Sequence, residues 1–216
     1  FDIFTPEVKE YIKNLKSNFS LSEIIDSLNS IKKPKVLVIG EAIIDRYTFV
    51  EPLGQIGKGS HTSVRNKYSV DYPCGAIAVA NHIGSFANEV TLFTGLGNVE
   101  RFENYDGFIK ESLLPNITPS FFYFKEAKTI VKERFINDTM DKFFEIYHSN
   151  SGQSSTFNEN VEIVDWLDSN LKNFDIVVVA DYGNGFITKP MTEVISRKSK
   201  FLAINTQINS GNRGYH

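Results

Sequence analysis

The segment from Lys35 to Arg46, which reads KVLVIGEAIIDR, constrains the fold of this chain more than any other. Its apolar run leads into Gly40, and two carboxylates, Glu41 and Asp45, follow at once. A short, continuous apolar run of this kind is typical of a parallel strand that is buried on both faces. In open α/β sheets, ligands bind in the crevice beyond the carboxyl ends of such strands. The segment therefore predicts a small-molecule site.

Two later segments repeat this pattern. Residues 175–180 (DIVVVA) precede Asp181, and residues 200–204 (KFLAI) precede Asn205. If all three runs are parallel strands of one sheet, the polar residues that follow them share one rim. Asp, Asn and Gly also follow strands because they form turns, so each run alone allows either interpretation. The three runs together favour a binding site.

Composition indicates an ordinary globular protein. The 216 residues suffice for one sizeable core with a small appended subdomain, and 41% are hydrophobic and 23% charged. A formal net charge of -3 gives no reason to expect nucleic acid or an anionic membrane as a partner. The sequence contains no apolar run of the roughly 20 residues that span a bilayer. Cys74 is the single cysteine, which favours a reducing compartment and hence a cytoplasmic location.

Helix signals open the chain. Thr5 is typical of an N-cap, and Pro6 of the first position in a helix. Ser20 and Glu23 have the spacing of a capping box, which predicts the start of a second helix. Lys33 and Pro34 end this helical part, which we take as residues 1–33. The chain begins with Phe1 rather than Met, so we expect it to be a piece of a longer polypeptide.

The rest of the chain, residues 34–216, alternates strands and helices. This alternation predicts an α/β fold with a right-handed, wound, mostly parallel sheet. Helices are expected near residues 75–87, 105–114, 159–171 and 190–197. Strand patterns around a segment rich in Gly and Pro predict a small antiparallel β lid, with its strands near residues 43–70 and 120–147.

Several familiar motifs are absent. The glycines from Gly54 to Gly59 lack the spacing and following helix of a phosphate-binding P-loop, and Gly95 to Gly97 lacks the third glycine of a dinucleotide site. The four histidines lack the spacing of metal ligands, so no metal site is predicted. No nucleophile elbow occurs.

Three motifs together resemble the ribokinase/PfkB carbohydrate kinases. They are KVLVIGEAIIDRY from Lys35, residues 72–80 (YPCGAIAVA) and residues 180–185 (ADYGNG). The similarity is greatest to the branch that acts on heptose 7-phosphate, and it runs from about Lys35 to the end of the chain. It implies a ribokinase-like fold and ATP-dependent phosphorylation of a sugar or sugar phosphate. ATP and Mg²⁺ are therefore expected for the intact parent protein.

The resemblance also implies roles for individual residues. Asp45 matches the aspartate that binds sugar hydroxyls, and Gly75 the second glycine of a Gly-Gly turn beside the sugar. Lys132 and Arg134 share a strand face that suits a sugar phosphate, although a solvated strand face would show the same pattern. Asp181 matches the aspartate near the phosphoryl-transfer centre.

The chain departs from the family pattern at several positions. Cys74 replaces the first glycine of the pair, and Ala78 stands where an asparagine contacts the sugar, leaving Asn81 as a substitute one helical turn later. Asn184 and Asn205, near the expected nucleotide, replace charged residues of the family. The Gly-Ala-Gly-Asp motif that supplies the anion hole and catalytic base is absent from the sequence. No catalytic residue is therefore predicted within this chain.

Two main hypotheses follow. The chain is the substrate-binding and lid part of a sugar kinase, or it is a kinase-derived module that binds sugar or forms a dimer without catalysis. A nucleotide-dependent oxidoreductase is a third option, opposed by the missing glycine fingerprint. Because heptose kinases of this branch occur fused to a nucleotidyltransferase, we interpret residues 1–33 as a linker from a preceding domain. A homodimer through the lid strands is also expected.

Overall fold

The computed structural model describes residues 3–30, 34–55, 62–98, 105–124, 127–149 and 161–207. The chain divides into two compact units, Phe1–Lys33 and Pro34–His216. Within the described ranges, no helix has the length and apolar character that a membrane span requires.

The first unit consists of two helices, α1 (Pro6–Asn18) and α2 (Leu21–Ser30). Thr5 is the N-cap of α1 in an extended conformation. The predicted capping box of α2 is confirmed, because the Ser20 backbone N–H donates to Glu23 Oε2 (2.7 Å) and the Glu23 N–H donates to Ser20 Oγ (3.2 Å). Two orphan N–H groups are thus satisfied at the start of this helix.

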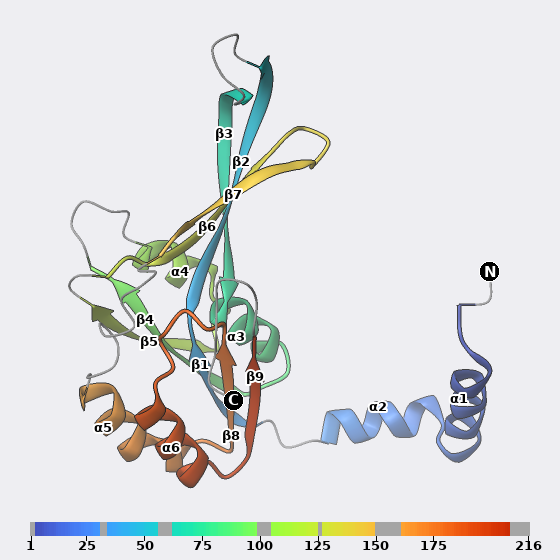
Figure 1. The fold of residues 1–216 in the computed structure, drawn as a ribbon. Helices are drawn as coiled ribbons and strands as arrows, with labels where there is room; N and C mark the ends of the chain where they lie inside the picture. The colour runs from blue at the N-terminus through green and yellow to red at the C-terminus, as the bar shows by residue number, and fades with distance from the viewer. Residues whose placement is uncertain are drawn as a thin grey trace. The chain divides into compact units, whose positions relative to one another are not determined.

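The second unit contains the predicted parallel sheet (Figure 1). Its five strands lie in the order β5-β4-β1-β8-β9, and every neighbouring pair is parallel. The strands are β5 (Ile117–Phe124), β4 (Glu89–Gly97), β1 (Lys35–Gly40), β8 (Ile176–Asp181) and β9 (Leu202–Thr206). The wound, mostly parallel α/β architecture expected from the alternating pattern is therefore confirmed.

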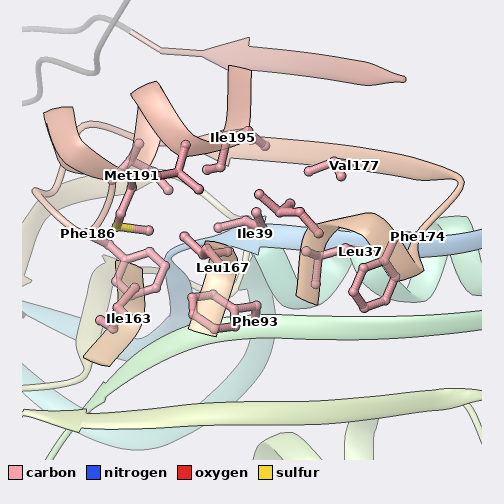
Figure 2. Close-up of a cluster of buried hydrophobic side chains, with 14 of the residues drawn as sticks. Leu37, Ile39, Phe93, Ile163, Leu167, Phe174, Val177, Phe186, Met191 and Ile195 are labelled. Carbon is pink, nitrogen blue, oxygen red and sulfur yellow. The ribbon is translucent and has the colours of Figure 1, made fainter. Parts of the chain in front are cut away.

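Alternate residues of β1 enter two different cores, which explains why its sequence is apolar without interruption. Val36 and Val38 pack in a cluster with residues of α3 (Ala76–Gly84) and α4 (Asp106–Ser112). Leu37 and Ile39 point into a second cluster with residues of α5 (Val161–Asn170), the short helix η2 (Leu171–Asn173) and α6 (Lys189–Lys198). Figure 2 shows this second cluster, in which Leu37, Ile39 and Leu167 have no exposed surface.

A four-stranded lid sheet extends away from the parallel sheet (Figure 1). Its order is β3-β2-β6-β7, formed by β2 (Ala42–Gln55), β3 (Thr62–Gly75), β6 (Ile130–Ile136) and β7 (Lys142–His148). The β2–β3 and β6–β7 pairs are antiparallel, but β2 and β6 are parallel, so the lid is a mixed sheet rather than the antiparallel one expected from the sequence. Since β2 begins two residues after β1 ends, the chain passes directly from the parallel sheet into the lid.

One predicted boundary of the lid is wrong. Residues 120–124 were expected in the lid, but they belong to β5, which pairs with β4 in the parallel sheet. The buried ends of β5, Ile117 and Phe124, contribute to the cores that flank this sheet. A short β-rich run bounded by polar turns looks the same in either sheet, so the sequence pattern does not distinguish them.

Polar side chains from all four strands connect across one face of the lid. Thr48 Oγ1 on β2 lies 2.9 Å from Ser69 Oγ on β3 and donates to Glu133 Oε1 on β6 (2.6 Å). Glu133 Oε2 lies 2.9 Å from His148 Nε2 on β7. Because successive side chains of a strand point to opposite faces, Asp45, Lys132 and Arg134 lie on the other face of the lid.

Candidate functional site

The carboxyl ends of three parallel strands align. Gly40 of β1 lies opposite Ala180 of β8, and Ala180 lies opposite Asn205 of β9. Asp181 is buried at this rim, whereas Asn205 is exposed. The expectation that Asp45 lies on this rim is wrong, because Asp45 falls within β2 of the lid.

Glu41 is buried where the parallel sheet meets the lid. Its carboxylate accepts two backbone hydrogen bonds from the segment that follows β8, from Tyr182 N–H (2.8 Å) and Asn184 N–H (3.1 Å). Its own carbonyl oxygen accepts the N–H of Ala76, the first residue of α3 (2.8 Å). Glu41 therefore connects the end of β1 with two segments that are distant in the sequence.

Burial is the main cause that raises the pKa of Glu41 from 4.5 to about 7. The N–H groups of Tyr182 and Asn184 act in the opposite direction, because they stabilise the ionised form. The neighbouring Asp181 carboxylate raises the pKa further. A carboxyl group that titrates near neutral pH at a strand end is typical of functional sites.

The raised pKa predicts a pH-dependent stability. The folded state holds the Glu41 proton more tightly than the unfolded chain, so this stabilisation is complete below pH 4.5 and is lost as the pH rises through about 7. We expect the loss to be roughly 3 kcal/mol in the free energy of unfolding. Urea unfolding between pH 4.5 and 8 should show this component in the wild type and lack it in Glu41→Gln. An unchanged pH slope in Glu41→Gln, relative to the surface control Glu51→Gln, would contradict the assignment.

Gly75 forms the turn between β3 and α3. Its φ angle is +62°, a conformation that glycine adopts at little cost. A Cβ atom at this position would lie 2.4 Å from the Glu41 carbonyl oxygen. The fold alone therefore requires glycine here, independently of the close approach of a sugar that the resemblance implies.

Asp45 is surrounded by residues from three other elements. Its Oδ1 lies 2.9 Å from Arg134 Nη1 on β6. Burial, followed by the nearby Asp45 carboxylate, raises the pKa of the Cys74 thiol on β3. Burial together with the neighbouring Cys74, Glu41 and Asp45 raises the pKa of the Tyr182 phenol. We call Asp45, Cys74, Lys132, Arg134 and Tyr182 the Asp45 cluster.

The central ion pair of this cluster is incompletely satisfied. Asp45 Oδ1 and Arg134 Nη1 are both buried, and neither atom has an aligned hydrogen-bond partner among the described residues. Their 2.9 Å contact is thus an electrostatic one with poor hydrogen-bond geometry. Buried polar atoms in native proteins are nearly always hydrogen-bonded, so this pair leaves capacity that a ligand could fill.

The cluster carries two cations on the same lid face. Lys132 pairs with Asp45 in the strand register and places Nζ 5.2 Å from the centre of the Tyr147 ring. The Arg134 guanidinium lies 5.4 Å from the centre of the Tyr47 ring. Both cations have intermediate exposure, so this face of β6 is half-buried rather than freely solvated.

Asn81 has a structural role. Its amide Nδ2 donates to the Ser112 carbonyl (2.9 Å), and its Oδ1 accepts the Leu114 N–H (3.0 Å). These bonds hold α3 against the segment that follows α4. The sugar contact of Asn81 stays a prediction, and both polar atoms of its side chain already have partners within the chain.

The sequence motifs assigned no individual role to two residues of this site. Tyr182 is one residue of the ADYGNG motif, and Glu41 was expected only as one of the carboxylates on the rim. The signal for Glu41 is a charged residue that stands between the apolar run of β1 and the apolar start of β2, a position that favours burial. Among the described residues, no group of three or more His, Cys, Asp or Glu side chains could hold a metal ion.

Comparison with known proteins agrees with the sequence motifs. No family model matches the chain. It is 27% identical over 184 residues to the bifunctional protein HldE of Shewanella piezotolerans, covering 83% of this chain and 36% of that protein. It is 25% identical over 176 residues to HldE of Campylobacter jejuni, covering 81% and 35%. The chain thus spans about a third of the length of these relatives.

Solved structures share the fold. Phosphofructokinase-2 from Escherichia coli, in complex with fructose-6-phosphate, matches with a TM-score of 0.54 and 16% identity, covering 82% of this chain and 56% of that one. Arabidopsis thaliana ribokinase, complexed with ribose and ATP, matches with a TM-score of 0.53 and 13% identity, covering 80% and 53%. The ribokinase-like fold and the resemblance to PfkB carbohydrate kinases near the HldE branch are therefore confirmed.

Proposed function

We propose that this chain, which has the ribokinase-like fold and resembles the PfkB carbohydrate kinases, is the sugar-binding part of an ATP-dependent sugar or sugar-phosphate kinase. The observation that carries the proposal is the buried, poorly aligned Asp45–Arg134 pair. A carboxylate can accept hydrogen bonds from two adjacent hydroxyls, and a guanidinium can bind a phosphate through two parallel bonds. A phosphorylated sugar offers both groups in one molecule.

In this proposal each residue of the Asp45 cluster has a role. Asp45 accepts hydrogen bonds from sugar hydroxyls, while Lys132 and Arg134 bind the anionic group of the substrate. Cys74 and Tyr182, whose pKa values both respond to the charge of Asp45, would limit the space around the sugar. Gly75 keeps the turn before α3 free of a side chain.

The nucleotide is proposed to bind at the strand ends. Asp181, Asn184 and Asn205 would lie near its phosphates, and ATP and Mg²⁺ are proposed for the longer parent protein. We propose that the parent is a bifunctional, cytoplasmic protein that also carries a nucleotidyltransferase. Residues 1–33 would then be a linker from that domain.

Isothermal titration calorimetry tests the sugar site. We expect this chain to bind fructose 6-phosphate or a heptose 7-phosphate more tightly than fructose or inorganic phosphate. Fructose offers only the hydroxyls and inorganic phosphate only the anionic group. Equal affinity for fructose and its phosphate would contradict the role of the two cations. Binding of none of these compounds would contradict the sugar site itself.

A non-catalytic sugar-binding or dimerisation module is the second candidate. The neutral side chains of Asn184 and Asn205 favour it, because both stand near the proposed nucleotide, where the family carries charge. Incubating the parent protein with ATP and a bound sugar phosphate separates the two candidates. Formation of ADP and a doubly phosphorylated sugar supports the kinase, whereas binding without turnover supports the module.

We further propose that the lid forms a homodimer. β7 is an edge strand of the lid sheet, and its Phe143, Phe144, Ile146 and Tyr147 are each at least 40% exposed. Exposed, apolar edge strands readily pair with another chain. We expect Ile146→Glu to convert a dimer into a monomer in sedimentation velocity runs.

Leu114→Glu is the matched control for this dimer test, because Leu114 is an exposed aliphatic residue outside the lid sheet. It should leave the dimer intact. A wild-type monomer at all concentrations, or a dimer that tolerates Ile146→Glu, would exclude this interface.

A further inference from the structure

Three consecutive backbone N–H groups after β8 point at carboxylates. Tyr182 N–H and Asn184 N–H donate to Glu41, while Gly183 N–H donates to Asp181 Oδ1 (2.8 Å). Gly183 has a φ angle of +72°, which turns the chain so that these groups converge. Successive N–H groups in such a turn form an anion-binding concavity. Here the side chain of Glu41 accepts two of these N–H groups and that of Asp181 accepts the third.

The same segment contains Tyr182, a member of the Asp45 cluster. The backbone of Tyr182 is bonded to Glu41, and its phenol lies close enough to Asp45 and Cys74 for their charges to affect its titration. Glu41 also fixes the start of α3 through Ala76 N–H, next to the Gly75 turn. The position of the phenol therefore depends on bonds that Glu41 makes.

We propose that Glu41 is the positioning residue of the Asp45 cluster: its ionised carboxylate holds residues 182–184 in the turn that places Tyr182 beside Asp45 and Cys74. That this turn affects sugar binding rests on the proposed function. That Glu41 holds the turn does not, because this part concerns only hydrogen bonds within the chain.

Ionisation of Glu41 should favour this turn over a local opening that breaks the two N–H bonds while Glu41 stays buried, because those bonds lower the pKa of Glu41 and burial raises it in both states. A protonated carboxyl group has one O–H donor in place of an acceptor, so it cannot accept both N–H groups equally well. The titratable groups that face Glu41 are Asp181 at the end of β8 and Tyr182. Cys74 on β3 and Asp45 on β2 face Tyr182 from the lid. With the Glu41 pKa at about 7, the ionised fraction falls about tenfold between pH 8 and pH 6.

Amide hydrogen exchange followed by NMR tests the turn without any ligand. We expect the protection of the Tyr182 and Asn184 amides, relative to their intrinsic exchange rates, to fall about tenfold from pH 8 to pH 6 in the wild type. Glu41→Gln has the same size but cannot accept both N–H groups, so its protection at pH 8 should be at least tenfold lower and independent of pH. The Val179 amide within β8 should not change.

Glu89→Gln is the control variant. Glu89 is the first residue of β4, its side chain is 46% exposed, and it pairs with Lys35 rather than with the turn. It should keep the wild-type protection at both pH values. Wild-type protection that is flat between pH 6 and 8, or equal in Glu41→Gln, would overturn the positioning role. Loss of protection across β8 in Glu41→Gln would show general unfolding and would overturn it as well.

Titration calorimetry at pH 8 then tests whether the turn affects the affinity for a sugar phosphate. We expect Glu41→Gln to bind fructose 6-phosphate about tenfold more weakly than the wild type, with Glu89→Gln unchanged. Equal affinity, combined with lost amide protection, would refute the link between the turn and the site. If the wild type binds no sugar phosphate, the proposed function fails, and the exchange data still decide the positioning role.

Discussion

Replacing Asp45 with alanine should abolish sugar-phosphate binding by this chain, with a loss of affinity of 100-fold or more. Hydrogen bonds to a charged group contribute about 1.5–3 kcal/mol each, and the proposed contact contains two of them. A loss of about 3 kcal/mol corresponds to roughly 100-fold in affinity. Titration calorimetry with fructose 6-phosphate measures the effect, and circular dichroism shows whether the fold is kept.

The chain offers a matched control for this substitution. Asp71 forms an ion pair with Arg46 at 2.8 Å on the opposite face of the same β2–β3 pair, with side-chain exposures of 21% and 22%. The Asp45–Arg134 pair has similar exposures of 15% and 23%. Asp71→Ala should therefore perturb the lid to a comparable degree without weakening sugar binding.

A second variant separates charge from folding. Removing Asp45 leaves the half-buried Arg134 with only the more distant carboxylate of Glu145 (3.6 Å), and such a loss can destabilise the fold. Asp45→Asn keeps the shape of the side chain and removes only its charge, so it should lose affinity while remaining folded. Wild-type affinity in Asp45→Asn, or an equal loss in Asp71→Ala, would contradict the role of Asp45.

Gly40→Ala should strongly destabilise the second unit. A Cβ atom on Gly40 would lie 2.2 Å from the Ala180 carbonyl oxygen, and that atom belongs to the backbone of the neighbouring strand. Relief of the clash requires β1 and β8 to separate where the site residues begin. Overpacking of this kind costs about 3 kcal/mol, which lowers the melting temperature by roughly 6–12 °C in a chain of this size.

Gly107→Ala is the control for this prediction. Gly107 lies in α4, and a Cβ atom there would meet no atom within 4 Å. Because alanine is the better helix former, this variant should be more stable by about 0.5–1 kcal/mol. Differential scanning calorimetry of both variants checks the pair. A melting temperature of Gly40→Ala within 2 °C or so of the wild type would contradict the close contact between the strands.

Local patterns in the sequence were sufficient to predict much of the fold. The apolar runs of β1 and β8 required burial on both faces, and the regular spacing of Ile163 and Leu167 required a helix packed on that sheet. The capping box of α2 depends on two residues only three positions apart. Such features follow from interactions between neighbours in the chain.

Long-range interactions account for what the sequence did not reveal. The assignment of β5 to the parallel sheet depends on its partner β4, which a strand pattern does not specify. Glu41 bonds to residues that lie about 140 positions away, so its carboxylate could be recognised as a candidate but its partners could not. Asn81 was singled out by its spacing along a helix, whereas its bonds to Ser112, the last residue of α4, and to Leu114 could not be predicted from that spacing. In each case the missing information was which segments meet in space.

The Asp45 cluster is where we propose that a phosphorylated sugar binds. Chemical-shift mapping by NMR during titration with fructose 6-phosphate tests it most directly, because every backbone amide reports separately. The proposed function predicts the largest shifts at Asp45, Cys74, Arg134 and Tyr182, with little change on the opposite lid face around Asp71 and His148. Shifts confined to that opposite face, or to residues far from both sheets, would contradict it.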